Sequence, residues 1–309
     1  MDLPHVVVCM LAADSLVPLR EVCTLSERAL DEQLVPEVIA SAAAIVTTPY
    51  DSIDDELLVR APRLRLLAQF GVGTDNIDLV AARSRGVAVT HTPGAVTEST
   101  ADFAMALLLA VARRLPEAQL SLDAGPQAQP LGMELAWKTI GIVGMGRIGK
   151  AVARRAKGFG MRVVYCNRRP ANPTVERETA AVRLTLIELL TCSDVVSLHC
   201  DLNADSYHLI NADALRRMKP TAILINTARA QVVDEAALAY AVARGEISGA
   251  GLDVFSRPVR SSLRESLRIV LAPHAGTATV GARREMSRMV VESIQACITN
   301  PARIPHRLV

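Results

Sequence analysis

The chain has 309 residues, half of them hydrophobic and only 3% aromatic, and its 34 basic and 32 acidic residues leave a net charge of +2. A chain of this length is expected to form two domains with a large buried core, and its near-neutral charge argues against a dedicated surface for nucleic acid or anionic membrane. With so few aromatic side chains the interior must consist mainly of Ala, Val, Leu and Ile, which suits a parallel sheet between helices.

The cysteines and the N-terminal segment bear on the cellular compartment. The six cysteines are scattered, with neither a CxxC pair nor a metal-ligand spacing to histidine, so we expect reduced thiols and no metal site. The N-terminal segment carries Asp2 and no basic run, and the most apolar stretch, residues 105–112, is too short to span a bilayer. We therefore expect a soluble cytoplasmic protein.

The first hundred residues alternate between short apolar runs and helical patterns. We predict buried strands at residues 6–9, 44–47, 66–70 and 87–90. A longer helical pattern starts near Thr97, has Glu98 in its first turn and runs to Arg114, ending before Pro116. These elements predict a small parallel-sheet domain whose last helix leads into a second domain.

The same alternation returns in the second half of the chain. We predict strands at residues 140–143, 163–166, 195–198, 223–226, 249–254 and 269–272. This series is typical of a Rossmann-type domain. Residues 121–130, rich in Gly, Pro and Gln, predict a loop, and residues 282–298 predict a helix that returns to the first domain.

A glycine-rich motif, Gly144-Met145-Gly146-Arg147-Ile148-Gly149, lies between one predicted strand and the helical pattern that begins near Lys150. The first glycine allows a tight turn, the second lets backbone N–H groups approach a pyrophosphate, and the third permits close packing of helix on strand. The helix N-terminus then stabilises the phosphate charge. In this context the motif predicts a dinucleotide-binding site, and a purely structural turn is the alternative.

The end of the next strand bears on the choice of cofactor. NAD-binding domains place an acidic residue there for the ribose 2'-hydroxyl, whereas a 2'-phosphate needs cations. This chain has Asn167-Arg168-Arg169, so no carboxylate repels a phosphate and two guanidinium groups can bind it. NADP(H) is therefore favoured. NAD(H) stays possible if the two arginines are solvated loop charges and the site is unselective.

Short motifs occur in order over nearly the whole chain, at residues 70–78, 92–94, 144–149, 218–220, 226–229, 252–255 and 273–274. Together they resemble those of the D-2-hydroxyacid dehydrogenases, and residues 96–102 and 154–161 most resemble glyoxylate and hydroxypyruvate reductases. The resemblance implies an α/β fold of two Rossmann-like domains with the active site in the cleft. Residues 1–98 with 277–309 would form a flavodoxin-like substrate domain, and residues 99–276 the NADP(H)-binding domain. It also implies reduction of small 2-oxo acids to 2-hydroxy acids, and a homodimer.

The resemblance also assigns the chemistry to individual residues. The backbone N–H groups of Val72 and Gly73 match the cradle for the substrate carboxylate, and Asn76 could add a side-chain donor. Arg229 matches the arginine that grips the carboxylate and polarises the carbonyl, a task suited to its fixed fork of donors. His274 matches the general acid. A simple βα turn, a surface arginine and a structural histidine are the alternatives at these positions.

Further residues match family positions that line the dinucleotide. They are Thr100, His199, Cys200, Thr227, Ala228, Asp253 and Gly276. Thr100 resembles a contact on the nicotinamide side. Asp253 fits a carboxylate that relatives use near the nicotinamide, although a buried aspartate that holds loop amides would look the same in sequence.

The family pattern is broken after Phe255. Relatives usually carry Glu-Pro there, and that glutamate orients the histidine and raises its pKa, but this chain reads Ser256-Arg257-Pro258. A like charge disfavours the protonated imidazole, so we expect a smaller fraction of His274 to be protonated near pH 7, which weakens it in the role of general acid. A second departure is Trp137, which stands where a glycine is usual.

Three explanations for the missing glutamate stay open. Glu265 can replace it as the partner of the histidine. Alternatively, Arg257 and Arg260 bind a second anionic group, so that the substrate is a 2-oxo acid with a phosphate, a phosphonate or a second carboxylate. In the third explanation the protein is catalytically impaired and binds its cofactor as a sensor or partner.

Overall fold

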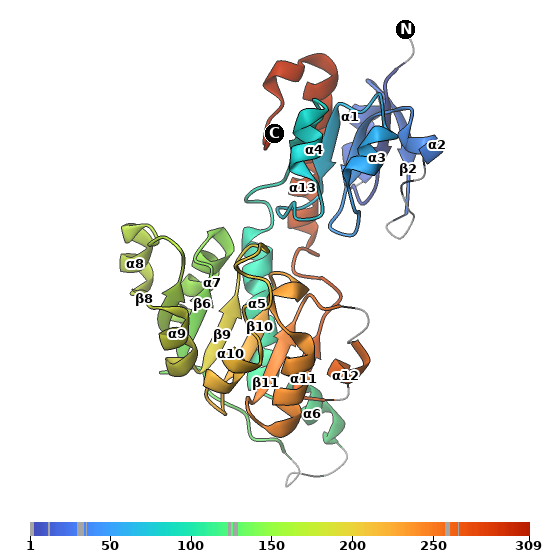
Figure 1. Ribbon diagram of the computed structural model, residues 1–309. Coiled ribbons are helices and arrows are strands. Elements are labelled where there is room, and N and C mark those ends of the chain that lie inside the picture. The colour runs from blue at the N-terminus through green and yellow to red at the C-terminus, as the bar shows by residue number, and fades with distance from the viewer. Residues whose placement is uncertain are drawn as a thin grey trace. The chain divides into compact units, whose positions relative to one another are not determined.

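The computed structural model describes residues 3–11, 13–29, 34, 36–122, 125, 129–256, 260–264 and 266–309. The chain divides into two compact units, one formed by Met1–Val96 with Ala278–Val309 and the other by Thr97–Thr277 (Figure 1). Each unit contains a parallel sheet between helices, which confirms the predicted fold class. None of the described helices is both long and apolar enough to cross a membrane.

The described part of the first unit contains a five-stranded parallel sheet of order β2-β1-β3-β4-β5, the flavodoxin-like order. Its strands are β1 (His5–Val8), β2 (Thr24–Glu27), β3 (Ala42–Thr47), β4 (Leu66–Gln69) and β5 (Ala88–Thr90). Its helices are α1 (Ala13–Arg20), α2 (Pro36–Ile39), α3 (Asp55–Val59), α4 (Leu79–Ser84) and α13 (Val280–Thr299), and a short 3₁₀ helix covers Pro301–Arg303.

Alternate residues of these strands point to opposite faces of the sheet. Val6 and Val8 of β1 pack with α1 and α13, whereas Val7 packs with α2, α3 and α4. Both faces are therefore buried, which explains why the inner strands are continuous apolar runs. The edge strand β2 was not predicted, because its sequence is polar and partly exposed.

The described part of the second unit contains a seven-stranded parallel sheet of order β12-β11-β10-β9-β6-β7-β8. Its strands are β6 (Thr139–Val143), β7 (Arg162–Cys166), β8 (Val182–Arg183), β9 (Val195–Leu198), β10 (Ile223–Asn226), β11 (Gly249–Leu252) and β12 (Ile269–Leu271). Its helices are α5 (Thr97–Ala112), α6 (Leu115–Leu120), α7 (Arg147–Gly158), α8 (Pro173–Thr179), α9 (Leu186–Cys192), α10 (Ala212–Arg217), α11 (Glu235–Arg244) and α12 (Arg260–Arg264), with a 3₁₀ helix at Ala230–Val232.

This strand order is that of a Rossmann domain. The chain runs outward from β6 to β7 and β8 on one side, and from β9 to β12 on the other. Helices α5, α7 and α8 cover one face, and α9, α10 and α11 cover the other (Figure 1). The point where the direction reverses, between β6 and β9, is where such sheets bind ligands at the carboxyl ends of their strands.

Two of the predicted element ends that differ from the structure have a clear physical cause. The long helix was expected to continue to Arg114, but α5 ends at Ala112 and Arg114 has a left-handed φ of +52°. Proline does not fit a helix interior, and Pro116 instead lies in the first turn of α6. β11 ends at Leu252 rather than residue 254, because Asp253 begins a loop.

Candidate active site

The glycine motif forms the turn between β6 and α7. Gly144 has φ +99°, and a Cβ at this position would lie 2.6 Å from the backbone of His199 and Cys200. A Cβ on Gly149 would lie 2.1 Å from the Gly144 carbonyl oxygen. Only glycine fits these two positions. Space is open around Gly146, by contrast, and this residue is the N-cap of α7, where it provides no side-chain cap.

The open start of α7 is suited to an anion. Helix N-termini leave backbone N–H groups unsatisfied, and here those of Arg147 and Ile148 receive no side-chain cap. The neighbouring Met145 N–H is already bound, because it donates to Asn167 Oδ1 at 2.7 Å. Asn167, directly after β7, therefore positions the turn. This arrangement fits a dinucleotide pyrophosphate.

Three arginines gather after β7. Arg168 and Arg169 are exposed in the loop that follows Asn167. Arg183, on the edge strand β8, donates from Nη2 to the carbonyl oxygens of Asn167 at 2.9 Å and Arg168 at 3.0 Å. Arg183 thus holds the loop that carries the two predicted phosphate-binding residues. Sequence reasoning missed it, because β8 was not predicted.

A partly buried histidine joins the ends of β9 and β10. His199 Nε2 shares a hydrogen bond with Ser197 Oγ at 2.8 Å, and Nδ1 shares one with Thr227 Oγ1 at 3.2 Å. Burial lowers the pKa of His199 to about 4, so the ring is neutral at pH 7. Burial also raises the pKa of the adjacent Cys200 thiol to about 11. Both groups are therefore uncharged at neutral pH.

Arg229 lies in a loop that Asn226 holds from the end of β10. The buried Asn226 side chain donates to the Arg229 carbonyl at 2.9 Å and accepts from the Ala228 N–H at 3.0 Å. The Arg229 guanidinium is partly buried and donates from Nη1 to the Ala228 carbonyl at 2.8 Å. The predicted polarising arginine is thus carried by a backbone that defined hydrogen bonds hold in place.

Asp253, after β11, organises the loop that carries His274. Its carboxylate accepts from the N–H groups of Ala275 at 2.6 Å and Gly276 at 2.9 Å, and its backbone carbonyl accepts from the His274 N–H at 2.9 Å. His274 itself has a left-handed φ of +56°. Burial raises the pKa of Asp253, although the two amides and His274 oppose that shift. Asp253 therefore does hold loop amides, as the alternative interpretation of the sequence anticipated.

Thr100 and Gly276 lie against this carboxylate. A Cβ on Gly276 would lie 2.8 Å from Asp253 Oδ2 and 3.5 Å from Thr100 Cγ2. The Thr100 hydroxyl is buried and forms no hydrogen bond with any residue that the structure describes. A buried hydroxyl without a partner in the protein is suited to a hydrogen bond with a ligand, such as the carboxamide of a nicotinamide.

The residues around the missing glutamate are only partly described. Arg257 and Glu265, on which two of the explanations depend, lie outside the described residues. Ser256, just before them, donates its N–H to the Glu235 carboxylate at 3.0 and 3.1 Å, and its hydroxyl donates there too. Glu235 opens α11 and is buried, which raises its pKa. No sequence pattern pointed to this contact.

In the first unit, the turn that carries Val72 and Gly73 is held by Gln69. The Gln69 side chain is fully buried at the end of β4. Its amide nitrogen donates to the Gly73 carbonyl and to Asn76 Oδ1, both at 2.9 Å, and its oxygen accepts from Thr47 Oγ1 at 2.7 Å. Every polar atom of Gln69 is thus used, and the predicted carboxylate cradle has a defined conformation.

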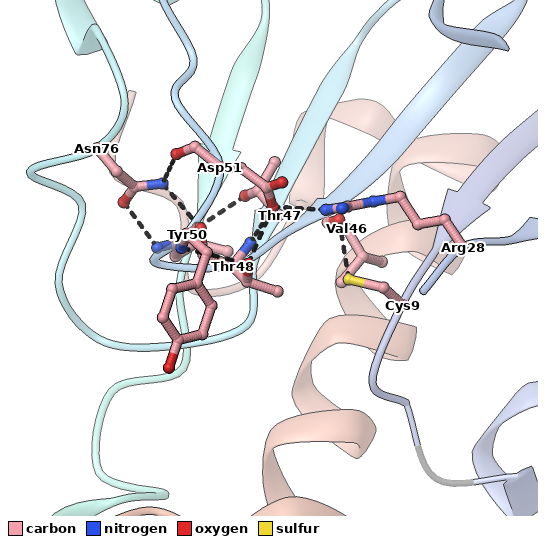
Figure 2. Close-up of polar contacts among 9 residues, drawn as sticks. Cys9, Arg28, Val46, Thr47, Thr48, Tyr50, Asp51 and Asn76 are labelled. Atoms are coloured by element: carbon pink, nitrogen blue, oxygen red, sulfur yellow. Dashed lines mark hydrogen bonds and ion pairs between the residues drawn. The ribbon is translucent and has the colours of Figure 1, made fainter. Parts of the chain in front are cut away.

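Asn76 serves the neighbouring loop and not the expected ligand. Its amide nitrogen donates to the carbonyl oxygens of Thr48 at 3.0 Å and Asp51 at 2.8 Å (Figure 2). The Asp51 carboxylate in turn accepts from the Thr48 N–H at 2.7 Å and pairs with the buried Arg28 at 2.5 Å. Because both Asn76 amide hydrogens are used, the structure gives this residue a positioning role in place of the predicted substrate contact.

Comparisons with known proteins agree with this organisation. The family described as D-isomer specific 2-hydroxyacid dehydrogenase, NAD binding domain, matches residues 105–276. A glyoxylate reductase of Korarchaeum cryptofilum is 46% identical over 274 residues, which cover 86% of this chain and 82% of that protein.

Solved structures match over the whole chain. The TT0316 protein from Thermus thermophilus is 40% identical, with a TM-score of 0.89 over 99% of this chain and 100% of that one. An NADPH-dependent glyoxylate/hydroxypyruvate reductase from Sinorhizobium meliloti, solved with NADP and malonate, is 32% identical, with a TM-score of 0.88 over 100% of this chain and 97% of that one. The chain therefore belongs to the D-isomer specific 2-hydroxyacid dehydrogenases, a family of oxidoreductases.

Proposed function

We propose that the protein is an NADP(H)-dependent reductase of small 2-oxo acids of the glyoxylate and hydroxypyruvate type. One observation carries the proposal. The glycine turn, Arg229 and His274 all follow the carboxyl ends of strands in one parallel sheet, which is where such sheets bind ligands. The same edge of the sheet holds the uncapped N-terminus of α7, an arginine and a histidine. These groups are suited to hydride transfer to a carbonyl.

The residues of the second unit fit NADP(H). The N–H groups of Arg147 and Ile148 would bind the pyrophosphate, and Arg168 with Arg169 would bind the 2'-phosphate. The chemistry that this cofactor supplies when bound is a hydride for the carbonyl carbon. The NADP present in the similar Sinorhizobium meliloti structure supports the choice.

The chain supplies the remaining parts of the reaction. Backbone N–H groups of Val72 and Gly73 bind the substrate carboxylate, and Arg229 polarises the carbonyl oxygen. As the carbonyl carbon is reduced, the oxygen gains negative charge, and His274 donates the proton that completes the 2-hydroxy acid. The Asp253 carboxylate and the Asn226 amide keep the two reacting side chains on fixed backbone.

Parallel assays with NADPH and NADH test the proposal. Cofactor absorbance is followed with glyoxylate and hydroxypyruvate from acid to neutral pH, and we expect turnover of both acids with a higher kcat/KM for NADPH. Cofactor binding in a fluorescence titration without turnover at any pH would instead mean that the protein is a cofactor-binding sensor or partner.

We also propose that the protein is a homodimer. Large apolar side chains are exposed on α6 and in the segments that follow it, at Leu115, Leu120, Leu122 and Leu131. Such groups of exposed leucines commonly mark a protein interface. Light scattering after size exclusion should give twice the chain mass of 33.1 kDa. A single chain mass at micromolar concentration would contradict the dimer.

A further inference from the structure

Arg283, in the first turns of α13, carries a charge that no carboxylate in the described part of the chain neutralises. Its guanidinium carbon lies 5.4 Å from the centroid of the buried Phe70 ring. The neighbouring arginines of α13 behave differently. Arg284 is exposed and lies 3.8 Å from Asp14, and Arg288 pairs with two glutamates of its own helix.

The charge of Arg283 is also costly where it stands. The side chain is partly buried, and that burial lowers the pKa of its guanidinium. A charge that loses water without gaining an ion pair is unfavourable, and contact with one aromatic face recovers only part of the loss. A ligand that accepts hydrogen bonds from the guanidinium would compensate for the rest of its lost hydration.

The place is next to the predicted carboxylate cradle within the same unit. Phe70 directly precedes the Gly71–Gly73 turn whose conformation Gln69 fixes. Tyr50 is near enough to Arg283 to interact with it electrostatically, and this interaction raises the pKa of the guanidinium, against the lowering by burial. Figure 2 shows that the Tyr50 ring extends away from the hydrogen bonds that hold its loop. Arg283 and Tyr50 therefore lie close to the turn where the first unit would hold a 2-oxo acid.

We propose that Arg283 binds an oxygen substituent on C3 of the substrate, either a hydroxyl or its phosphate ester. This inference rests on the proposed reduction of 2-oxo acids. With the substrate carboxylate on the N–H groups of Val72 and Gly73 and the carbonyl oxygen assigned to Arg229, the remaining polar group of a three-carbon acid is the one on C3. A guanidinium presents several fixed donors to such an oxygen. Glyoxylate has no C3 and pyruvate has only a methyl group there, so neither uses this contact.

Arg283→Met tests the inference, because methionine still covers the Phe70 ring but donates no hydrogen bond. Values of kcat/KM are measured with NADPH for glyoxylate, pyruvate, hydroxypyruvate and 3-phosphohydroxypyruvate. We expect the preference for an acid with a C3 oxygen over pyruvate to fall by about tenfold or more, while glyoxylate changes by less than about threefold. A loss on hydroxypyruvate alone assigns the hydroxyl, and a larger loss on its phosphate ester assigns the anion.

Two further variants separate binding from folding. Arg284→Met removes a neighbouring exposed charge and should leave all substrate ratios unchanged. Arg283→Lys keeps the charge and should recover part of the preference for a C3 oxygen. Equal losses of Arg283→Met on all four acids would overturn the inference in favour of a role in the fold, and unchanged ratios would overturn it as well. If the wild-type protein reduces none of the acids, the proposed function fails first and the C3 contact fails with it.

Discussion

The buried carboxylate of Asp253 accepts hydrogen bonds from the backbone N–H groups of Ala275 and Gly276. The backbone carbonyl of Asp253 accepts one from the N–H of His274. The candidate general acid is thus held by backbone contacts from the neighbouring strand end. Such support is needed because His274 has a left-handed φ, which is unfavourable for a residue with a side chain.

Asp253→Asn should disturb this loop while changing few atoms. An asparagine can accept only one of the two N–H groups and turns its own NH₂ toward the other, so a buried donor loses its partner. We expect a loss of about 2 kcal/mol in the free energy of unfolding and a fall in kcat of about tenfold or more. Urea unfolding and steady-state kinetics measure the two effects, and a variant with wild-type kcat would show that the loop does not position His274.

His199 predicts how stability depends on pH. Its folded pKa of about 4 is below the ordinary value of 6.5, so between these values the unfolded chain binds the extra proton. The free energy of unfolding should therefore fall as the pH is lowered from about 6.5 to about 4, by on the order of 3 kcal/mol, with no further loss from this group below that window.

His199→Gln isolates this contribution, because glutamine keeps polar atoms near Ser197 and Thr227 but does not titrate. The difference in unfolding free energy between the wild type and the variant should change across the window. Other titrating groups are common to both proteins and cancel in that difference. A constant difference from pH 7 to pH 4 would mean that burial does not lower the pKa of His199 in the folded protein.

The arginines after β7 predict cofactor selectivity. Replacing Arg168 and Arg169 together by alanine should raise the KM for NADPH by about tenfold or more and that for NADH far less, since only NADPH carries the 2'-phosphate. Arg183→Met should also raise the KM for NADPH, but by less, because Arg183 only positions the loop through the carbonyls of Asn167 and Arg168.

Arg177→Ala is the matched control for these variants, because Arg177 is an exposed arginine on the nearby α8 whose side chain donates to the Thr174 hydroxyl. It should leave both KM values unchanged. Equal increases for NADPH and NADH in the double variant would contradict the assignment of the 2'-phosphate to this loop.

The sequence predicted the strands that are apolar runs, and it missed β2, whose sequence is polar, and β8, which has only two residues. It located the glycine turn because the chemistry of a close approach restricts the residue type. It also marked Trp137 as a departure from glycine, and the structure shows the reason for the usual glycine, since Trp137 has a φ of +67°. The family pattern thus records a backbone requirement that this chain meets at some cost.

The contacts that hold the site were not predictable, because they join residues that are distant in sequence. Asn76 looked like a substrate donor, but its amide hydrogens are used by Thr48 and Asp51, on a loop more than twenty residues earlier. Glu235 and Ser256 meet in the same way across a gap of 21 positions. No local pattern records which of several polar side chains will face a given carbonyl or amide.

Gln69 offers the sharpest test of whether the first unit binds the substrate carboxylate. Gln69→Leu removes the donor to the Gly73 carbonyl and to Asn76 Oδ1, and it removes the acceptor of the Thr47 hydroxyl. We expect a loss of about 2 to 4 kcal/mol in the free energy of unfolding, because several buried polar groups lose hydrogen bonds at once.

The kinetic effect of Gln69→Leu should be confined to the 2-oxo acid and should spare the cofactor. A looser Gly71–Gly73 turn would present the N–H groups of Val72 and Gly73 less well, so the KM for glyoxylate should rise by about tenfold. The dissociation constant of NADPH should stay unchanged, because the residues proposed to bind it belong to the other unit. Gln69→Glu serves as the partner variant, because its carboxylate still accepts from Thr47 but no longer donates to Gly73. Should the KM for glyoxylate stay at the wild-type value in a folded variant, the turn would not be the carboxylate cradle, and the carboxylate would have to be bound by Arg229 alone.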